Sequence, residues 1–187
     1  SLDDTIVLLD PTSGDVLHRI SGNGSGIWSV GWSPDGDTIA GGTTNGEILS
    51  WDLDGLEDGA PPRVMPRHLN WVSGISYSPD GKRIATAGAD NRVVLTDLES
   101  DRAFTLPGHR GAVRSVEFSP DGKRLVSGAK DNLVIVWDVS EPGADKEPLV
   151  GYAGHTDGVN DVRWSPDGQK VASGSDDGSV LLWLGVE

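Results

Sequence analysis

Residues 106–138 read LPGHRGAVRSVEFSPDGKRLVSGAKDNLVIVWD, with Gly-His near the start, a Ser-Pro-Asp-Gly turn in the middle and Trp-Asp at the end. The turn occurs four times in the chain, beginning at Ser33, Ser78, Ser119 and Ser165. Pro presets the first central position of such a turn, Asp tolerates the second, and Gly takes the positive φ that follows. The copies lie 45, 41 and 46 residues apart, which predicts a repeat array rather than one irregular fold.

Each turn lies between short apolar or alternating runs, the pattern of antiparallel strands joined as hairpins. Alignment on the turns gives four strands per repeat, here called a, b, c and d in chain order, which is typical of a propeller blade. The predicted strands are 27–32, 38–42, 47–51 and 63–66 in repeat 1; 72–77, 83–87, 92–96 and 103–106 in repeat 2; 113–118, 124–128, 133–137 and 148–152 in repeat 3; and 159–164, 170–174 and 179–183 in repeat 4. Two orphan strands precede repeat 1, a c strand at 5–9 and a d strand at 15–20.

The chain is therefore predicted to be one repeat domain over residues 1–187. Its parts are the orphan strands at 1–22 and repeats at 23–67, 68–108, 109–154 and 155–187, the last without a d strand. Within strand a, large apolar residues follow one another at steps of three and then two, as at Val113, Val116 and Phe118. Because side chains in a regular strand alternate by two, the step of three predicts a bulge in the first half of each a strand.

Composition and charge limit the classes of partner. The 187 residues suffice for one domain with a sizeable core, and the net charge is −14. Phosphate backbones and anionic membranes are bound through clustered Lys and Arg, which the chain lacks, so we expect neither nucleic acid nor a membrane as partner. The absence of cysteine excludes disulfides, thiolate metal sites and a Cys nucleophile.

No apolar run approaches the roughly 20 residues of a membrane span, and the N-terminus does not resemble a signal peptide. We therefore expect a cytoplasmic protein. The chain begins at Ser1 without a Met, which indicates an excised or engineered segment whose native ends are unknown.

Gly-His near the start and Trp-Asp at the end of a four-stranded repeat of about 44 residues resemble the WD40-repeat family, and the resemblance covers essentially the whole chain. The Ser-Pro-Asp-Gly-Lys turn resembles bacterial members of that family. The resemblance implies an all-β fold, a β-propeller of four-stranded antiparallel blades with strand a nearest the central channel. This chain would supply about four of the blades.

Propellers of this family commonly have seven or eight blades, so four repeats imply about half a ring. Three solutions are open: an eight-bladed homodimer, pairing with a different chain, or a strained four-bladed ring. We favour the homodimer, because closed symmetric assembly is the commonest way to remove open edges. The d strand at 15–20 could then complete repeat 4 of the partner, which leaves the c strand at 5–9 redundant with 179–183.

The resemblance also implies a structural hydrogen-bond tetrad in each blade, formed by His before strand a, Ser or Thr in strand b, Asp in the b–c turn and Trp at the end of strand c. Repeats 3 and 4 carry all four members: His109, Ser127, Asp131 and Trp137, and His155, Ser173, Asp177 and Trp183. Repeat 2 keeps His68, Thr86 and Asp90 but has Thr96 in the Trp position. Repeat 1 keeps only Trp51, beside Asn23, Gly41 and Asn45, so blade 1 is expected to depend on packing alone.

The Ser, His and Asp of one repeat imitate a hydrolase triad. The set is repeated, is expected to be buried and has no G-x-S-x-G elbow, so the structural interpretation is favoured. The histidines do not show the spacing of metal ligands either. We therefore predict no catalytic, cofactor-binding or metal-ligating residue and no cofactor.

Trp32 and Trp164 share the repeat position of Tyr77 and Phe118, which we expect in the core between blades. Trp28 and Trp71 fall at the start of strand a and are not explained by the repeat pattern. In the family this region and the neighbouring b–c turn form the narrow top face, where partners often dock, and aromatic side chains at a rim are typical interface anchors. The predicted top-face site consists of Trp28, Trp71, Arg114, Lys130, Asn160 and Asp176. The alternative is that both indoles cover the bulge or pack on a neighbouring blade, and that the polar residues are ordinary surface.

Three functions remain open. The favoured one is a non-enzymatic scaffold that presents a rigid top face to a protein or peptide. The second is an engineered or excised half-propeller whose partner is another copy of itself. The third is a small-molecule-binding or catalytic propeller, which would need carboxylates or histidines that converge at the channel mouth.

Overall fold

The computed structural model describes residues 1–57, 59–141, 143 and 147–184, and its regular elements are all strands. The sheets are antiparallel and follow one another in chain order. An end sheet contains β1 (Thr5–Leu9) and β2 (Val16–Ser21); blade 1 contains β3 (Ile27–Trp32), β4 (Thr38–Thr43), β5 (Glu47–Asp52) and β6 (Arg63–Pro66); blade 2 contains β7 (Val72–Tyr77), β8 (Arg83–Gly88), β9 (Val93–Asp97) and β10 (Ala103–Leu106); blade 3 contains β11 (Val113–Phe118), β12 (Arg124–Ala129), β13 (Leu133–Asp138) and β14 (Val150–Ala153); blade 4 contains β15 (Val159–Trp164), β16 (Lys170–Ser175) and β17 (Val180–Leu184).

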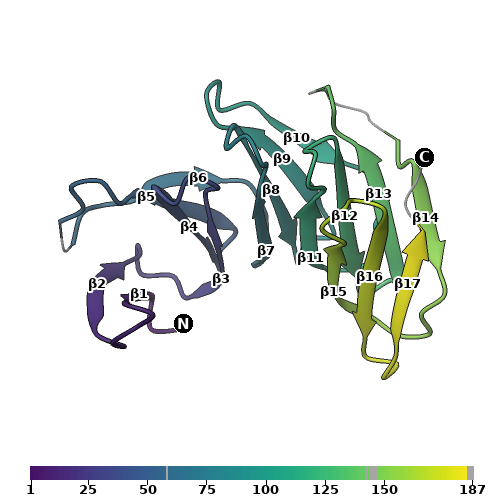
Figure 1. The fold of residues 1–187 in the computed structure, drawn as a ribbon, viewed down its shortest axis with the longest axis horizontal. Helices are drawn as coiled ribbons and strands as arrows, with labels where there is room; N and C mark the ends of the chain where they lie inside the picture. The colour runs from purple at the N-terminus through teal and green to yellow at the C-terminus, as the bar shows by residue number, and fades with distance from the viewer. Residues whose placement is uncertain (58, 142, 144–146, 185–187) are drawn as a thin grey trace.

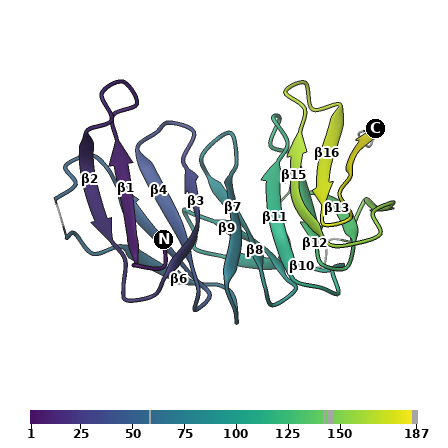
Figure 2. The same cartoon turned by 90° about the horizontal axis from the view of Figure 1, so that it is seen from below.

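The blades stand side by side in an open arc, with the end sheet and blade 4 at opposite ends (Figures 1 and 2). The first strands of successive blades contact one another, β3 with β7, β7 with β11 and β11 with β15. The all-β propeller class is confirmed, and every predicted strand is found within two residues of its predicted bounds. Completion of an eight-bladed ring by a second copy stays a prediction.

The repeated Ser-Pro-Asp-Gly turns explain the regularity of the blades. In blade 3 the Ser119 hydroxyl donates to Asp121 Oδ1 over 2.6 Å, Asp121 Oδ1 accepts the Lys123 N–H at 3.0 Å, and Gly122 has a φ of 70°. The Ser119 hydroxyl and the Lys123 N–H lower the pKa of the Asp121 carboxyl. The same bonds recur in the other three turns, so each a–b hairpin closes at a fixed place.

Apolar layers between neighbouring sheets form the core. Ile6 and Ile20 of the end sheet pack against Ile27, Ile39 and Leu49 of blade 1. The two faces of blade 3 divide in the same way, because side chains alternate along each strand. Phe118, Leu125 and Trp137 pack toward blade 2, and Val126, Val134 and Val136 pack toward blade 4.

The contact between blades 3 and 4 leaves no room for a side chain at one strand position. A Cβ built on Gly128 of β12 would lie 2.5 Å from Val159 Cγ1 of β15. The equivalent Gly174 of β16 has no heavy atom near such a Cβ, because no blade covers that face in this chain. Gly128 therefore sets how closely the two blades approach.

One core prediction was wrong. Trp32 was expected in the blade-to-blade core, like its counterparts Phe118 and Trp164, but it is 50% exposed. The end sheet pairs only β1 with β2 and has no inner strands, so that side of β3 is left open.

Candidate top-face binding site

A buried histidine is held by two partners in three of the blades. His68 Nδ1 lies 2.9 Å from Asp90 Oδ1, and His68 Nε2 lies 2.8 Å from Thr86 Oγ1. Since an ionised carboxylate can only accept, Nδ1 carries the proton and Nε2 accepts from the hydroxyl. Equivalent bonds join His109 to Asp131 (3.0 Å) and Ser127 (2.7 Å), and His155 to Asp177 (2.9 Å) and Ser173 (2.7 Å).

The tryptophan of each set is bonded differently. Trp183 Nε1 donates to Ser173 Oγ over 2.8 Å, which completes a four-membered set in blade 4. Trp137 Nε1 donates instead to the Pro107 carbonyl over 3.0 Å, so the bond to Ser127 implied by the resemblance is not formed. The Trp137 ring nevertheless stays edge-on to His109, with the ring centroids 5.8 Å apart.

Blade 1 replaces the histidine network with a surface network that the sequence did not reveal. Asn23 Nδ2 and Asn45 Nδ2 both donate to Glu47 Oε2, over 2.6 and 2.9 Å. The network also reaches one fully buried residue, because the Thr43 hydroxyl donates to Asn45 Oδ1. The buried Trp51 Nε1 has no hydrogen-bond partner among the described residues, so packing alone holds the Trp51 ring but not this edge of blade 1.

The ionisation of these networks suits a structural role. Burial lowers the pKa of His68, against the opposing effect of Asp90, so its imidazole is neutral at neutral pH. Burial alone would raise the pKa of Asp90, but the Leu69 N–H and His68 outweigh it and hold that pKa below the usual value. The Ser179 hydroxyl and the Thr156 N–H likewise lower the pKa of Asp177.

The predicted bulge is confirmed in the first strand of every blade. The pairing register shifts between Ile27 and Ser29, Val72 and Gly74, Val113 and Ser115, and Val159 and Asp161. The extra residues are Trp28, Ser73, Arg114 and Asn160. A bulge leaves its extra residue out of the strand pairing and redirects its side chain. The bulges therefore position three of the six candidate residues, Trp28, Arg114 and Asn160.

Trp28 and Trp71 meet across the boundary between blades 1 and 2. Their ring centroids lie 5.0 Å apart with an interplanar angle of 42°, yet the residues remain 53% and 43% exposed. An aromatic pair with this much free surface leaves ring faces open to a ligand.

Three of the polar candidates form a network across blades 3 and 4. Arg114 Nη1 donates to Asn160 Oδ1 and, over 2.7 Å, to Asp176 Oδ2. Asn160 Nδ2 donates to Asp176 Oδ1 over 2.6 Å, and Arg114 and Asn160 lower the pKa of the Asp176 carboxyl. Lys130 is exposed, and its ammonium makes no hydrogen bond or ion pair with any residue that the structure describes.

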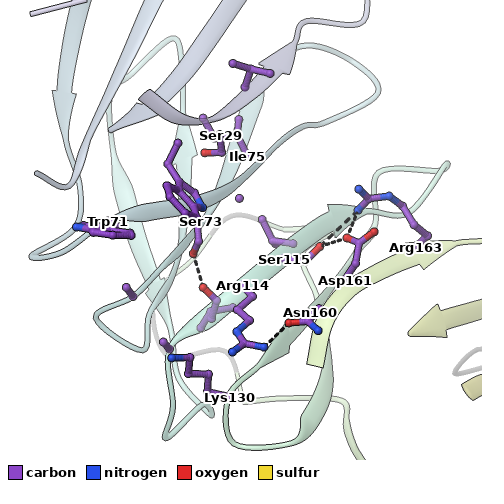
Figure 3. Close-up of a pocket in the computed structure, with 17 residues that line it drawn as sticks. Ser29, Trp71, Ser73, Ile75, Arg114, Ser115, Lys130, Asn160, Asp161 and Arg163 are labelled. Carbon is purple, nitrogen blue, oxygen red and sulfur yellow. Dashed lines mark hydrogen bonds and ion pairs between the residues drawn. The ribbon is translucent and has the colours of Figure 1, made fainter. Parts of the chain in front are cut away.

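A groove of about 640 Å³ brings five of the six candidates together (Figure 3). Trp28, Trp71, Arg114, Lys130 and Asn160 line it, whereas Asp176 supports Arg114 and Asn160 from outside the lining. Figure 3 shows Trp71 at one end and Arg163 at the other, with Arg114 and Lys130 between them on one side.

Sequence reasoning missed five polar residues of the groove. They are Ser29, Ser73, Ser115, Asp161 and Arg163. Arg163 Nη1 pairs with Asp161 Oδ1 over 2.8 Å, and the Ser115 hydroxyl donates to Asp161 Oδ1 over 2.7 Å. The bulge pattern could have located them, because all but Ser73 follow the bulged residue by one or three positions on the inner strands.

No group of three or more His, Cys, Asp or Glu side chains that could hold a metal ion is found among the residues described by the structure. Over the same residues, no helix has the length and apolarity needed to cross a membrane.

Comparison with known proteins agrees with the repeat architecture. The chain is 35% identical over 91 residues to a WD repeat-containing protein 26 homolog from Arabidopsis thaliana, which covers 49% of this chain and 15% of that protein. It is 38% identical over 68 residues to ribosome assembly protein 4 from Chaetomium thermophilum, covering 36% of this chain and 13% of that protein. A guanine nucleotide-binding protein subunit beta from Zea mays is 27% identical over 103 residues, or 54% of this chain and 26% of that protein. The chain thus spans only a small part of the length of these relatives.

A family model described as WD domain, G-beta repeat matches residues 14–52, 59–97, 100–138 and 146–183. Each match runs from a d strand to the next c strand, whereas the predicted repeats run from strand a to strand d. The boundaries of the predicted repeats stay a prediction. The four matches cover most of the chain, so the protein belongs to the WD40-repeat family.

Proposed function

We propose that this protein is a non-enzymatic interaction scaffold whose top-face groove binds a protein or peptide. The observation that carries the proposal is the Trp28–Trp71 pair, which lines a groove of about 640 Å³ and leaves about half of each residue exposed. Exposed aromatic residues in a concave site are the usual anchors of interfaces. The family supports the same function, because WD40 proteins bind protein partners.

A selection from a displayed random-peptide library tests this proposal. Peptides selected on the purified chain would be synthesised, and their affinities measured by calorimetry for the wild type and for Trp28→Ala and Trp71→Ala. Truncation of a central aromatic anchor costs about 2 kcal/mol, so both variants should bind at least about tenfold more weakly.

Trp32→Ala is the matched control, because Trp32 lies on the same strand as Trp28 and is equally exposed but does not line the groove. Its affinity should equal that of the wild type. Selected peptides that bind Trp28→Ala, Trp71→Ala and Trp32→Ala alike would refute a top-face site.

A second candidate function is self-association through the open face of blade 4. Val180, Leu182 and Leu184 of β17 are 72%, 72% and 77% exposed, whereas Val134 and Val136, the blade 3 counterparts of Val180 and Leu182, are buried under the next blade. We propose that a second copy covers this face, since contiguous apolar surface of this kind marks an interaction site.

The end sheet limits how such a dimer could close. β1 is not loose: it pairs with β2 from Thr5 to Leu9, and Ile6 packs on blade 1. A ring in which β2 completes blade 4 of the partner therefore requires the partner's β17 to take the place of β1. Light scattering over a wide concentration range should show a particle near twice 19.7 kDa, and a monomer at all concentrations would exclude this candidate.

A bacterial origin and a cytoplasmic location remain parts of the proposal. The relatives reported above are eukaryotic, and support for the location comes from one further relative, a probable cytosolic iron-sulfur protein assembly protein from Candida glabrata.

A further inference from the structure

The groove is a basic site in an acidic chain. The chain carries a net charge of −14, yet the charged residues that line the groove are Arg114, Lys130 and Arg163 against the single acid Asp161. A local excess of positive charge in a concave site favours a negatively charged ligand.

The cations of the groove are not equally available. Arg163 is neutralised by Asp161 at 2.8 Å. Arg114 is paired with Asp176 at 2.7 Å, but it uses only Nη1 for Asn160 and Asp176, and its Nε and Nη2 form no hydrogen bond with the described residues. Lys130 lies on the b–c turn beside it, and its ammonium has no hydrogen bond or ion pair with any described residue, although its charge contributes to lowering the pKa of Asp176. Arg114 and Lys130 are therefore the cations that can receive an anionic group.

The hydroxyl groups of the inner strands are already used. The Ser29 hydroxyl donates to the Val72 carbonyl over 2.9 Å, the Ser73 hydroxyl donates to the Val113 carbonyl, and the Ser115 hydroxyl donates to Asp161. These bonds join neighbouring blades. They leave few uncharged hydrogen-bond donors free to bind a ligand at the bottom of the groove. Specific recognition must then come from the aromatic pair and the two cations.

We infer that the ligand of this groove is a peptide segment with an aromatic or large aliphatic side chain that stacks on Trp28 and Trp71, and an Asp or Glu side chain that binds Arg114 and Lys130. This inference rests on the proposed function and adds the chemistry of the partner. Aromatic faces can also bind cations, but the unpaired Lys130 ammonium and the unbonded Nε and Nη2 of Arg114 in the same groove oppose a cationic ligand.

The test uses a random heptapeptide library that is acetylated at the N-terminus and amidated at the C-terminus, so that a carboxylate can come only from Asp or Glu. Peptides captured on the wild-type chain should be enriched in an acidic residue at one position and an aromatic or large aliphatic residue at another. Replacement of that acidic residue by its amide, Asp→Asn or Glu→Gln, should weaken binding by at least about fivefold, as expected for a charge-assisted contact.

Lys130→Glu is the informative variant, because the Lys130 side chain has no hydrogen bond or ion pair to lose within the described residues. It should lose the acidic preference and keep the aromatic one. Lys123→Glu makes the same charge change on an a–b turn that does not line the groove, and it should select the wild-type motif.

The outcomes separate the two proposals. Peptides that depend on Trp28 and Trp71 but show no acidic preference, or prefer Lys and Arg, would overturn this inference and leave the scaffold function standing. Failure to enrich any peptide over a surface without protein would overturn both.

A fluorescent oligothymidylate measured by anisotropy should not bind, and binding that Lys130→Glu abolishes would reassign the groove to single-stranded nucleic acid.

Discussion

The hydroxyl of Ser173 accepts a hydrogen bond from the indole nitrogen of Trp183 over 2.8 Å, while it also bonds His155 Nε2 at 2.7 Å. Its counterpart in blade 3, Ser127, bonds only His109, because the Trp137 indole is taken by the Pro107 carbonyl. Blades 3 and 4 thus carry the same four residue types but form different hydrogen bonds between them.

This difference predicts unequal effects of the same substitution. Ser173→Ala leaves the buried His155 and the partly buried Trp183 without their partner, Ser127→Ala leaves only His109 without one, and each group so orphaned costs about 1–3 kcal/mol. Urea denaturation should therefore show a loss of about 2–5 kcal/mol for Ser173→Ala and about half as much for Ser127→Ala. Equal losses of unfolding free energy in the two variants would contradict this difference in hydrogen bonding.

Gly128 and Gly174 form a second matched pair. Gly128→Ala places a methyl group 2.5 Å from Val159 Cγ1 and should destabilise the chain by about 1–3 kcal/mol, the usual cost of overpacking. Gly174→Ala meets no atom and should leave thermal stability nearly unchanged. If Gly174→Ala lowered the melting temperature as much as Gly128→Ala, then blade 4 would be covered in solution.

The pKa of His68 predicts a loss of stability in mild acid. Burial lowers that pKa below 6.5, so below pH 6.5 the unfolded chain binds a proton that the folded imidazole refuses. The contribution of His68 is therefore complete above pH 6.5 and decreases as the pH falls. His68→Gln should be less stable at pH 7.5 but show a weaker pH dependence between 7.5 and 5, measured by urea denaturation. Parallel curves for both proteins would rule this out.

Glu117 should behave in the opposite way. Burial raises its pKa despite the bond that its carboxylate accepts from the Trp164 N–H. The ionised group therefore costs stability at neutral pH, and the cost disappears as the pH falls below the ordinary value of 4.5. Glu117→Gln, whose amide oxygen can still accept from Trp164, should be more stable than wild type at pH 7 and equal to it near pH 4. A destabilised variant at pH 7 would show that the charge itself is needed.

The fold was largely predictable, because its information is local. The Ser-Pro-Asp-Gly turns fix where each hairpin closes, and the step from Val113 to Val116 revealed the bulge. Features that depend on neighbouring sheets were not visible in the sequence. Trp32 is exposed because the end sheet has no inner strands, and the Trp137 indole finds Pro107 because Gly108, at a φ of 139°, turns that segment toward it.

The candidate site was predictable in part. Residue type and position within the repeat identified Trp28, Trp71, Arg114, Lys130, Asn160 and Asp176, five of which line one groove. Sequence reasoning did not reveal that Asp176 serves Arg114 rather than the groove, nor that Asp161 neutralises Arg163. The Arg114–Asp176 pair depends on which charged side chains meet across a blade boundary, and no spacing along one strand contains that information. Asp161 and Arg163 lie two residues apart on β15, so their pairing was within reach of the sequence.

The blades stand in a row, and each packs mainly on its immediate neighbours. This arrangement determines the order in which the blades unfold. Damage to one blade reaches a distant blade only through those in between, so the chain is expected to lose order from its ends while blades 2 and 3 persist. The groove lies mainly over these central blades, so the proposed binding surface would be the last part of the arc to lose its structure.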